Sequence, residues 1–283
     1  MESLQLHPTQ KKKKLRQKDL INMKHDIKII FVDIDWTILN HKIHDWDYES
    51  LDALKAAQEK GILVYLCTAR PYDSIVHTGI LDILTPDGII ATNGGVAFVK
   101  DEVLFSNEIP ENIVKTVENV ANRHDLVVEM STDRGRYFTA PQNIWVDEYF
   151  KSYAETIPPV IKDQSGNVSA MLLFAPEFMD EGLIAELPSE IRYFRFDLYG
   201  VDLCYYQNDK GRAITRVIEH LGIEKEQSMG IGDDYGDIPM FEAVGVSIAM
   251  GNGKVEAQEK ATYVADTIHE HGIAKIFQEL ELI

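Results

Sequence analysis

Two aspartates lie one residue apart at the end of an apolar run. In the segment FVDIDWTIL, residues 31–39, these are Asp33 and Asp35. Carboxylates this close repel each other unless a cation lies among them. Their position at the end of the run, rather than within it, indicates that the pair serves a polar site and not the core.

Other polar residues follow other apolar runs of the chain. Thr68 and Arg70 follow one such run, and the segment GDDYGD after another adds three more aspartates, Asp233, Asp234 and Asp237. Hard oxygen ligands suit Mg²⁺, and the lack of His or Cys in the group disfavours zinc. Because Mg²⁺ binds phosphate oxygens readily, the group predicts a small phosphorylated metabolite as substrate. Asp33 would then attack phosphorus, while Asp35 donates a proton to the leaving group and later activates water.

The segments that carry these residues alternate between strand and helix patterns. Continuous apolar runs predict strands at 28–33, 62–68, 88–93, 228–233 and 245–250, and apolar residues at helical spacing predict helices at 50–61 and 211–222. This alternation is typical of an α/β fold with a doubly wound, mostly parallel sheet. Ligands of such sheets bind at the carboxyl ends of the strands, where the aspartates and Thr68 stand.

The middle of the chain has a different pattern. Residues 96–106 predict a hairpin, and several further strands follow with helical stretches between them. We therefore expect a core domain made of residues 27–85 and 204–283, with an α+β domain inserted as residues 86–203. Residues 1–26 are expected to form a basic, disordered extension.

Composition limits the partners. The 283 residues have a formal net charge of -18, although the first 28 residues are basic. Such an acidic body repels nucleic acid and anionic membrane surfaces, so neither is expected as a partner. No apolar run approaches the ~20 residues that span a bilayer, and the N-terminus lacks a signal-peptide core, which predicts a cytoplasmic protein. Cys67 and Cys204 lie in apolar runs and are expected to be free thiols. The oligomeric state is not determined by the sequence.

Four motifs in order carry a family resemblance. DIDWT, CTAR (67–70), Lys210 before a helix, and GDDYGD resemble the motifs of the haloacid dehalogenase superfamily of phosphatases, and the large insert resembles the cap of its Cof-type (type IIB) branch. The resemblance implies Asp33 as nucleophile and Asp35 as acid and base. It also implies that Thr68 binds the transferring phosphoryl group and that Lys210 neutralises it.

The same resemblance implies the metal ligands and some weaker contacts. The metal would be Mg²⁺, held by Asp33, Asp35, Asp233 and Asp237. Weaker substrate contacts are expected from Arg70, Asn93, Gly94 and Asn252. In the cap, candidates for selecting the substrate are Glu129, Arg134, Arg136, Tyr137, Trp145 and Arg195.

Three positions depart from the family pattern. Trp36 replaces the usual glycine after the second aspartate, Ala69 replaces the glycine of TGR, and Gly236 replaces an asparagine of the metal loop. The last change removes a hydrogen-bonding group and would weaken metal binding or lower the rate.

Several functions compete. A phosphatase that releases phosphate through an aspartyl-phosphate is the main hypothesis, and a phosphosugar mutase is the second. A non-catalytic sensor of a phosphorylated ligand is the alternative that Gly236 suggests. A receiver domain of two-component signalling also has an aspartate cluster with Thr and Lys, but it needs no large insert and carries no acid/base carboxylate two residues after its phospho-acceptor.

Overall fold

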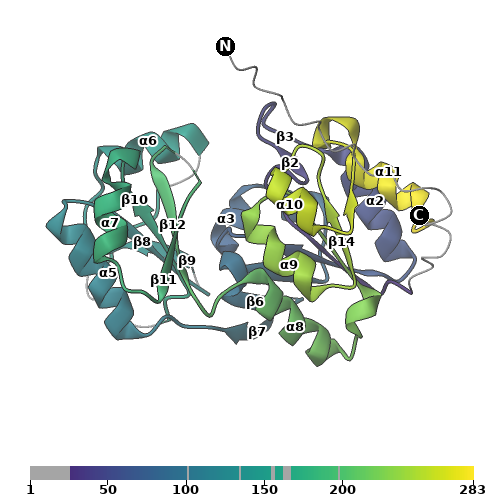
Figure 1. Ribbon diagram of the computed structural model, residues 1–283, viewed down its shortest axis with the longest axis horizontal. Helices are drawn as coiled ribbons and strands as arrows, with labels where there is room; N and C mark the ends of the chain where they lie inside the picture. The colour runs from purple at the N-terminus through teal and green to yellow at the C-terminus, as the bar shows by residue number, and fades with distance from the viewer. Residues whose placement is uncertain (1–25, 101, 134, 154–156, 162–166, 197) are drawn as a thin grey trace, which may run out of the picture.

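The structure is a computed structural model that describes residues 26–100, 102–133, 135–153, 157–161, 167–196 and 198–283. The expected extension at 1–26 lies outside the described residues except for Asp26, and so does Arg134. The chain forms two lobes that lie side by side (Figure 1). One lobe contains both the first strands and the last helices, and the other contains the middle of the chain.

The first lobe is built on an eight-stranded sheet with the order β15-β14-β13-β1-β4-β5-β6-β7. Its strands are β1 (Ile29–Val32), β4 (Leu63–Cys67), β5 (Gly88–Ala91), β6 (Val96–Val99), β7 (Glu102–Ser106), β13 (Ser228–Gly232), β14 (Val246–Ala249) and β15 (Tyr263–Val264). All neighbours from β15 to β5 pair in parallel, and β6 and β7 add an antiparallel hairpin. The predicted α/β fold with a mostly parallel sheet and an inserted cap is therefore confirmed.

Both faces of this sheet are covered by helices, because successive side chains of a strand point to opposite sides. Ile30 and Val32 pack in one cluster with α2 and α11, whereas Ile29 and Phe31 pack in another with α8 and α9. The helices of this lobe are α2 (Tyr48–Glu59), α3 (Tyr72–His77), α4 (Ile80–Ile83), α8 (Lys210–Leu221), α9 (Ile238–Ala243), α10 (Val255–Lys260) and α11 (Gly272–Glu279). Short 3-10 turns are η1 (Thr92–Gly94), η3 (Lys225–Gln227), η4 (Tyr235–Asp237) and η5 (Ile268–Glu270).

The second lobe is an antiparallel sheet with the order β11-β12-β10-β8-β9. Its strands are β8 (Val127–Thr132), β9 (Gly135–Phe138), β10 (Ala170–Phe174), β11 (Ile191–Arg195) and β12 (Gly200–Tyr205), and its helical elements are α5 (Glu111–Arg123), α6 (Ile144–Tyr153), η2 (Glu177–Met179) and α7 (Asp180–Glu186). This lobe has its own buried cluster, to which α5 and α7 contribute. We call it the cap.

The boundaries expected for the insert need a correction. Residues 88–106 form β5, β6 and β7, and all three strands belong to the eight-stranded sheet of the first lobe. The cap therefore begins after Ser106 rather than at residue 86, because the hairpin extends the parallel sheet by backbone pairing with β5. At the other end, the expected limit of 203 falls inside β12, which continues to Tyr205.

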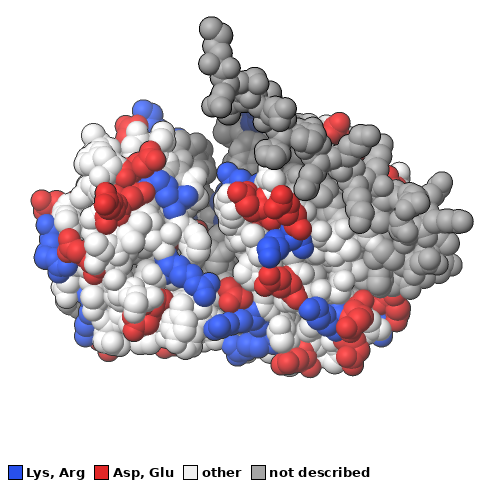
Figure 2. Space-filling model, in the orientation of Figure 1, with Lys and Arg blue, Asp and Glu red and all other residues white. Residues whose placement is uncertain are grey.

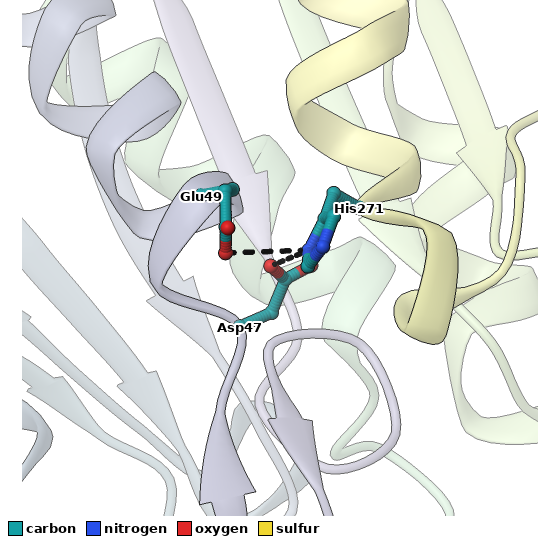
Figure 3. Close-up of side chains that lie close together, drawn as sticks. All are labelled: Asp47, Glu49 and His271. Carbon is teal, nitrogen blue, oxygen red and sulfur yellow. Dashed lines mark hydrogen bonds and ion pairs between the residues drawn. The ribbon is translucent and has the colours of Figure 1, made fainter.

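A small hairpin, β2 (Leu39–Asn40) with β3 (Asp45–Trp46), follows the first motif and leads into α2. Asp47 begins that helix by accepting a hydrogen bond from the Ser50 amide. The His271 ring donates to the same carboxylate at 2.7 Å and lies 3.4 Å from Glu49, which joins the start of α2 to the start of α11 (Figure 3). The buried Asp47 carboxylate is thus engaged as a helix cap.

The visible surface carries charges of both signs. On the face shown in Figure 2, acidic and basic side chains of the described residues are interspersed, without an extended basic patch. Within the described ranges, none of the helices has both the length and the apolar character needed to cross a bilayer. Both cysteines, Cys67 and Cys204, are free thiols as expected.

Candidate active site

The carboxyl ends of three neighbouring strands bring the predicted motifs together. Asp33 follows β1, Thr68 follows β4 and Asp233 follows β13, and these strands lie in the order β13-β1-β4. The amide of Asp33 still donates to Ile231 at 2.9 Å, so ladder pairing fixes the backbone of this residue. The parallel arrangement therefore accounts for the meeting of side chains that are 200 residues apart in the sequence.

Lys210 is the first residue of α8, and its ammonium group lies between two carboxylates. Nζ donates to Asp33 Oδ1 at 2.7 Å and to Asp237 Oδ1 at 2.6 Å, and all three side chains are buried. Burial alone would lower the pKa of Lys210, but the carboxylates of Asp237 and Asp33 outweigh it and raise that pKa well above its ordinary value. The lysine thus remains charged and holds the expected nucleophile in place.

Three carboxylates gather at a distance that suits a metal ion. Oxygen atoms of Asp33, Asp233 and Asp237 all lie within 4.8 Å of one another. Burial raises the pKa of Asp33 to about 7, against the opposing effect of Lys210. Burial and then the neighbouring carboxylates raise the pKa of Asp233 well above its ordinary value. Crowded, desolvated oxygen ligands without His or Cys fit a hard divalent cation, which would relieve their repulsion.

The loop that carries two of these aspartates is folded onto itself. Asp237 Oδ2 accepts hydrogen bonds from the amides of Asp233 and Asp234, at 2.8 and 3.0 Å. Asp234 caps the turn and is not one of the three gathered carboxylates. A β-carbon at Gly236 would meet nothing closer than 3.8 Å, where the nearest atom is the Asn93 side-chain oxygen. The loop therefore has room for a β-carbon at this position.

Asp35 takes part in a different set of contacts. Arg70 binds its carboxylate through two nitrogens, at 2.9 and 2.8 Å, and His41 Nε2 lies 2.6 Å from Oδ1. Burial would raise the pKa of Asp35, but Arg70 and His41 outweigh it and hold that pKa well below its ordinary value. The expected contribution of the Asp35 side chain to the metal site is therefore not supported, because this carboxylate is engaged with Arg70 and His41 instead.

Trp36, which replaces the usual glycine after Asp35, has a backbone conformation that favours glycine. Trp36 has a φ of 57°, in the left-handed region where glycine is favoured, and its side chain is 41% exposed beside His41. Asn252 supports this strained turn: its side-chain amide donates to the Trp36 carbonyl at 2.8 Å, and its oxygen accepts from the Ile268 amide. Both ends of the Asn252 amide thus contact backbone, so its expected role in substrate binding remains a prediction.

Asn93 and Gly94 lie at the end of β5, near Thr68. The Asn93 amide donates to the Thr68 carbonyl at 3.1 Å, and its side chain donates to Cys204 of the cap at 3.4 Å. Gly94 has a φ of 91°, and a β-carbon there would lie 2.3 Å from the carbonyl oxygen of Asp209. The glycine therefore permits the close approach that places Lys210 at the site.

Two contacts of the site were not expected from the sequence. Thr37 is fully buried, and its hydroxyl donates a hydrogen bond to Asp233 Oδ1 at 3.2 Å. His41 lies soon after the first motif, and its spacing from other His and Asp residues matches no ligand set. The small hairpin of β2 and β3 turns the chain back and places His41 beside Asp35. The sequence signal for this contact was a histidine a few residues after the first motif.

The comparisons with known proteins agree with this geometry. A family model described as haloacid dehalogenase-like hydrolase matches residues 30–277. The chain is 27% identical over 288 residues to the 5-amino-6-(5-phospho-D-ribitylamino)uracil phosphatase YwtE of Bacillus subtilis (strain 168), covering 90% of this chain and 98% of that one. It is 26% identical over 253 residues to the phosphoglycolate phosphatase of Methanothermobacter thermautotrophicus, covering 88% and 96%.

A solved structure shows the same fold. The HAD subclass IIB sugar phosphatase BT4131 superposes with a TM-score of 0.78 at 24% identity, covering 90% of this chain and 100% of that one. The expected resemblance to the haloacid dehalogenase superfamily is therefore confirmed by the family model, and the expected core with an inserted cap by this superposition. The chain belongs to the haloacid dehalogenase-like hydrolases, and within that family it is a phosphatase, a phosphoric monoester hydrolase of phosphorylated small molecules.

Proposed function

We propose that the protein is a Mg²⁺-dependent phosphatase of a sugar phosphate or similar metabolite and that it acts through an aspartyl-phosphate on Asp33. The single observation that carries this proposal is the fixed Asp33 carboxylate, bound to Lys210 at 2.7 Å within the group of three carboxylates. Such a carboxylate is held in one orientation toward an incoming phosphoryl group, and positioning supplies much of the rate in phosphoryl transfer.

The other residues have separate roles in the proposed reaction. Lys210 neutralises charge on the phosphoryl group, and the Thr68 hydroxyl, at the end of β4, donates a hydrogen bond to it. Asp35 stands two residues after the nucleophile, where it faces the leaving group. Because Arg70 keeps this carboxylate ionised, Asp35 is suited to accept a proton from the water that hydrolyses the aspartyl-phosphate.

A bound Mg²⁺ would add positive charge beside the phosphoryl oxygens. Asp33, Asp233 and Asp237 would hold the ion, since their oxygens lie within 4.8 Å of one another. Thr37 would orient the Asp233 carboxylate through its 3.2 Å hydrogen bond. Asp237 would be shared between the ion and Lys210, which fixes the position of both charges.

The test is phosphate release from sugar phosphates, nucleotides, phosphoglycolate and p-nitrophenyl phosphate, with Mg²⁺ and with EDTA. We expect release that needs Mg²⁺ in the wild type and falls by at least ~10³-fold in Asp33→Asn, because the amide cannot act as the nucleophile. Asp52→Asn, an exposed change on α2, is the matched control. Release by Asp33→Asn at the wild-type rate would exclude the aspartyl-phosphate on this residue.

A second candidate is the phosphosugar mutase. In this reaction Asp35, held by Arg70 and His41, would accept the proton of a second hydroxyl of the same sugar instead of that of water. Appearance of an isomeric sugar phosphate without free phosphate, followed by ³¹P NMR, would favour this function over hydrolysis.

A further inference from the structure

One face of the cap sheet is turned toward the catalytic residues. Val201 and Leu203 of β12 point into the buried cluster beneath α5 and α7. Because neighbouring residues of a strand point to opposite faces, Asp202 and Cys204 lie on the other side of the sheet. Cys204 Sγ accepts a hydrogen bond from Asn93 of the first lobe at 3.4 Å. The face of β12 that carries Asp202 therefore meets the carboxyl edge of the catalytic sheet.

The carboxyl group of Asp202 is close enough to the catalytic residues to interact with them electrostatically. Burial and then the Asp35 carboxylate raise the pKa of Asp202 to about 7, while Lys210 opposes the rise. The backbone of Asp202 pairs with both neighbouring strands, but among the described residues its carboxylate accepts no hydrogen bond and forms no ion pair. The Asp202 side chain is only partly buried, so its carboxylate is open to accept hydrogen bonds from a ligand that lies on this face of the cap sheet.

Asp202 lies between two apolar side chains on the same face. In the strand pairing, Leu172 of β10 is directly opposite on one side and Phe194 of β11 on the other. The Phe194 side chain is 47% exposed. A hydrogen-bond acceptor flanked by apolar surface matches a polyhydroxylated group, whose hydroxyls donate and whose C–H faces pack against apolar side chains.

The other cap residues named from the sequence are already engaged. On the same face as Asp202, Arg136 donates to Asp73 of α3 at 2.8 Å and lies 3.7 Å from Glu129. Tyr137 and Trp145 pack with the apolar cluster of the cap, and Arg195 is bound by Asp180. Within the described part of the cap, these contacts occupy the charged candidates and leave the Asp202 carboxylate available to a substrate.

We propose that Asp202 determines which leaving group the phosphatase accepts, by binding the hydroxyls of a polyhydroxylated leaving group and repelling leaving groups that carry a second anion. This inference rests on the proposed function, because it places the phosphoryl group at Asp33 and the leaving group beneath the cap. The two effects have separate causes. Above pH 7 the Asp202 carboxylate is ionised and accepts hydrogen bonds from hydroxyls, and together with Asp35 it makes the pocket unfavourable for a carboxylate or another phosphate.

The test compares kcat/KM for three kinds of substrate in the presence of Mg²⁺. These are sugar and polyol phosphates, phosphoglycolate with its extra carboxylate, and p-nitrophenyl phosphate without leaving-group hydroxyls. In Asp202→Ala we expect a loss of about 10- to 100-fold on the sugar and polyol phosphates that the wild type hydrolyses best, because a charge-assisted hydrogen bond is removed. The rate on p-nitrophenyl phosphate should change by less than about threefold.

A second variant separates the two effects. Asp202→Asn keeps an acceptor oxygen but loses the negative charge, so part of the activity on polyol phosphates should return while phosphoglycolate becomes a better substrate than in the wild type. Glu181→Gln, on α7 at the opposite side of the cap sheet, makes the same charge change and should leave all ratios unaltered. The thermal midpoint of Asp202→Asn should not fall, since an unpartnered carboxylate contributes no stability.

The outcomes are distinguishable. Equal losses on polyol phosphates and p-nitrophenyl phosphate would overturn the inference by placing Asp202 in the chemical step, and unchanged substrate ratios would overturn it by removing Asp202 from selection. A clear drop in the thermal midpoint would show a structural role instead. In each of these cases the proposed function stands if the wild type releases phosphate and Asp33→Asn does not. A wild type that hydrolyses none of the compounds would refute both proposals.

Discussion

Replacing Lys210 by methionine should destabilise the protein in a way that depends on pH and on metal. The ammonium group lies 2.7 Å from Asp33 and 2.6 Å from Asp237, and the three side chains are between 2% and 9% exposed. Methionine has a similar length but no charge, so Lys210→Met leaves two buried carboxylates without their shared cation. Removing one partner of a buried ion pair typically costs about 3–5 kcal/mol. We therefore expect this loss in the free energy of unfolding at pH 8 in EDTA.

The loss should become smaller in two conditions. At lower pH a carboxyl group of the variant takes up a proton, which reduces the deficit by ~1.4 kcal/mol per pH unit for each extra proton bound. Mg²⁺ should also reduce it, because the ion replaces the missing positive charge among Asp33, Asp233 and Asp237. Phosphate release should nevertheless fall by ~10²-fold or more, since the lysine no longer stabilises the transferring group.

The assay is urea unfolding followed by circular dichroism at pH 5.5 and pH 8, with EDTA and with Mg²⁺. Lys260→Met, an exposed change at the end of α10, is the matched control and should alter stability by less than ~0.5 kcal/mol. If Lys210→Met unfolded at the wild-type urea concentration at pH 8 in EDTA, the lysine would not be compensating the two carboxylates. A deficit that did not change between pH 5.5 and pH 8 would likewise contradict the electrostatic origin.

Three further outcomes follow from the site and its surroundings. The folded pKa of Asp33, about 7, lies above its ordinary value of 3.8, so the folded state binds this proton more tightly and the stability contributed by Asp33 is lost as pH rises through 7. The rise in thermal midpoint on adding Mg²⁺ should therefore be greater at pH 8 than at pH 5.5. An equal rise at both pH values would count against these three aspartates as the metal ligands. Gly94→Ala should lower the free energy of unfolding by ~3 kcal/mol or more, because residue 94 has a φ of 91° and its new β-carbon would lie 2.3 Å from the Asp209 carbonyl oxygen. An unchanged midpoint of chemical denaturation would show that the close approach is not required. Asp73→Asn should weaken the contact between the lobes, since Arg136 loses a charge-assisted hydrogen bond of 2.8 Å, worth ~1.5–3 kcal/mol. Small-angle X-ray scattering of the variant should then show a larger radius of gyration than that of the wild type. An identical scattering curve would mean that other contacts hold the lobes together.

The core fold and the main catalytic residues could be predicted because their signals are local. Buried parallel strands require continuous apolar runs, and each such run ends at a polar residue that must lie at the ligand-binding edge. This reasoning predicts the place of Asp33, Thr68 and Asp233 at that edge of the sheet. Lys210 was recognisable as a cation at the start of a helix, where the helix dipole disfavours positive charge. The family followed from the order of these motifs.

The limits of the cap could not be read in the same way. The hairpin of β6 and β7 has a strand pattern that suits an α+β insert as well as an extension of the core sheet. What decides between them is the pairing of β6 with β5, through backbone groups that are the same in every sequence. A pairing partner is a tertiary choice, so the sequence placed the start of the cap too early.

The parallel sheet, the presence of a cap and the aspartates at the strand ends could be predicted from the sequence, because apolar periodicity and motif order depend on neighbours along the chain. Which charges meet depends on the packing of the folded chain: Arg70 and His41 meet Asp35, and Asp202 faces the site. These contacts join residues from separate strands, a hairpin and two lobes. The strength of a charge interaction depends on distance and burial, which arise from packing and leave no pattern in the order of residues.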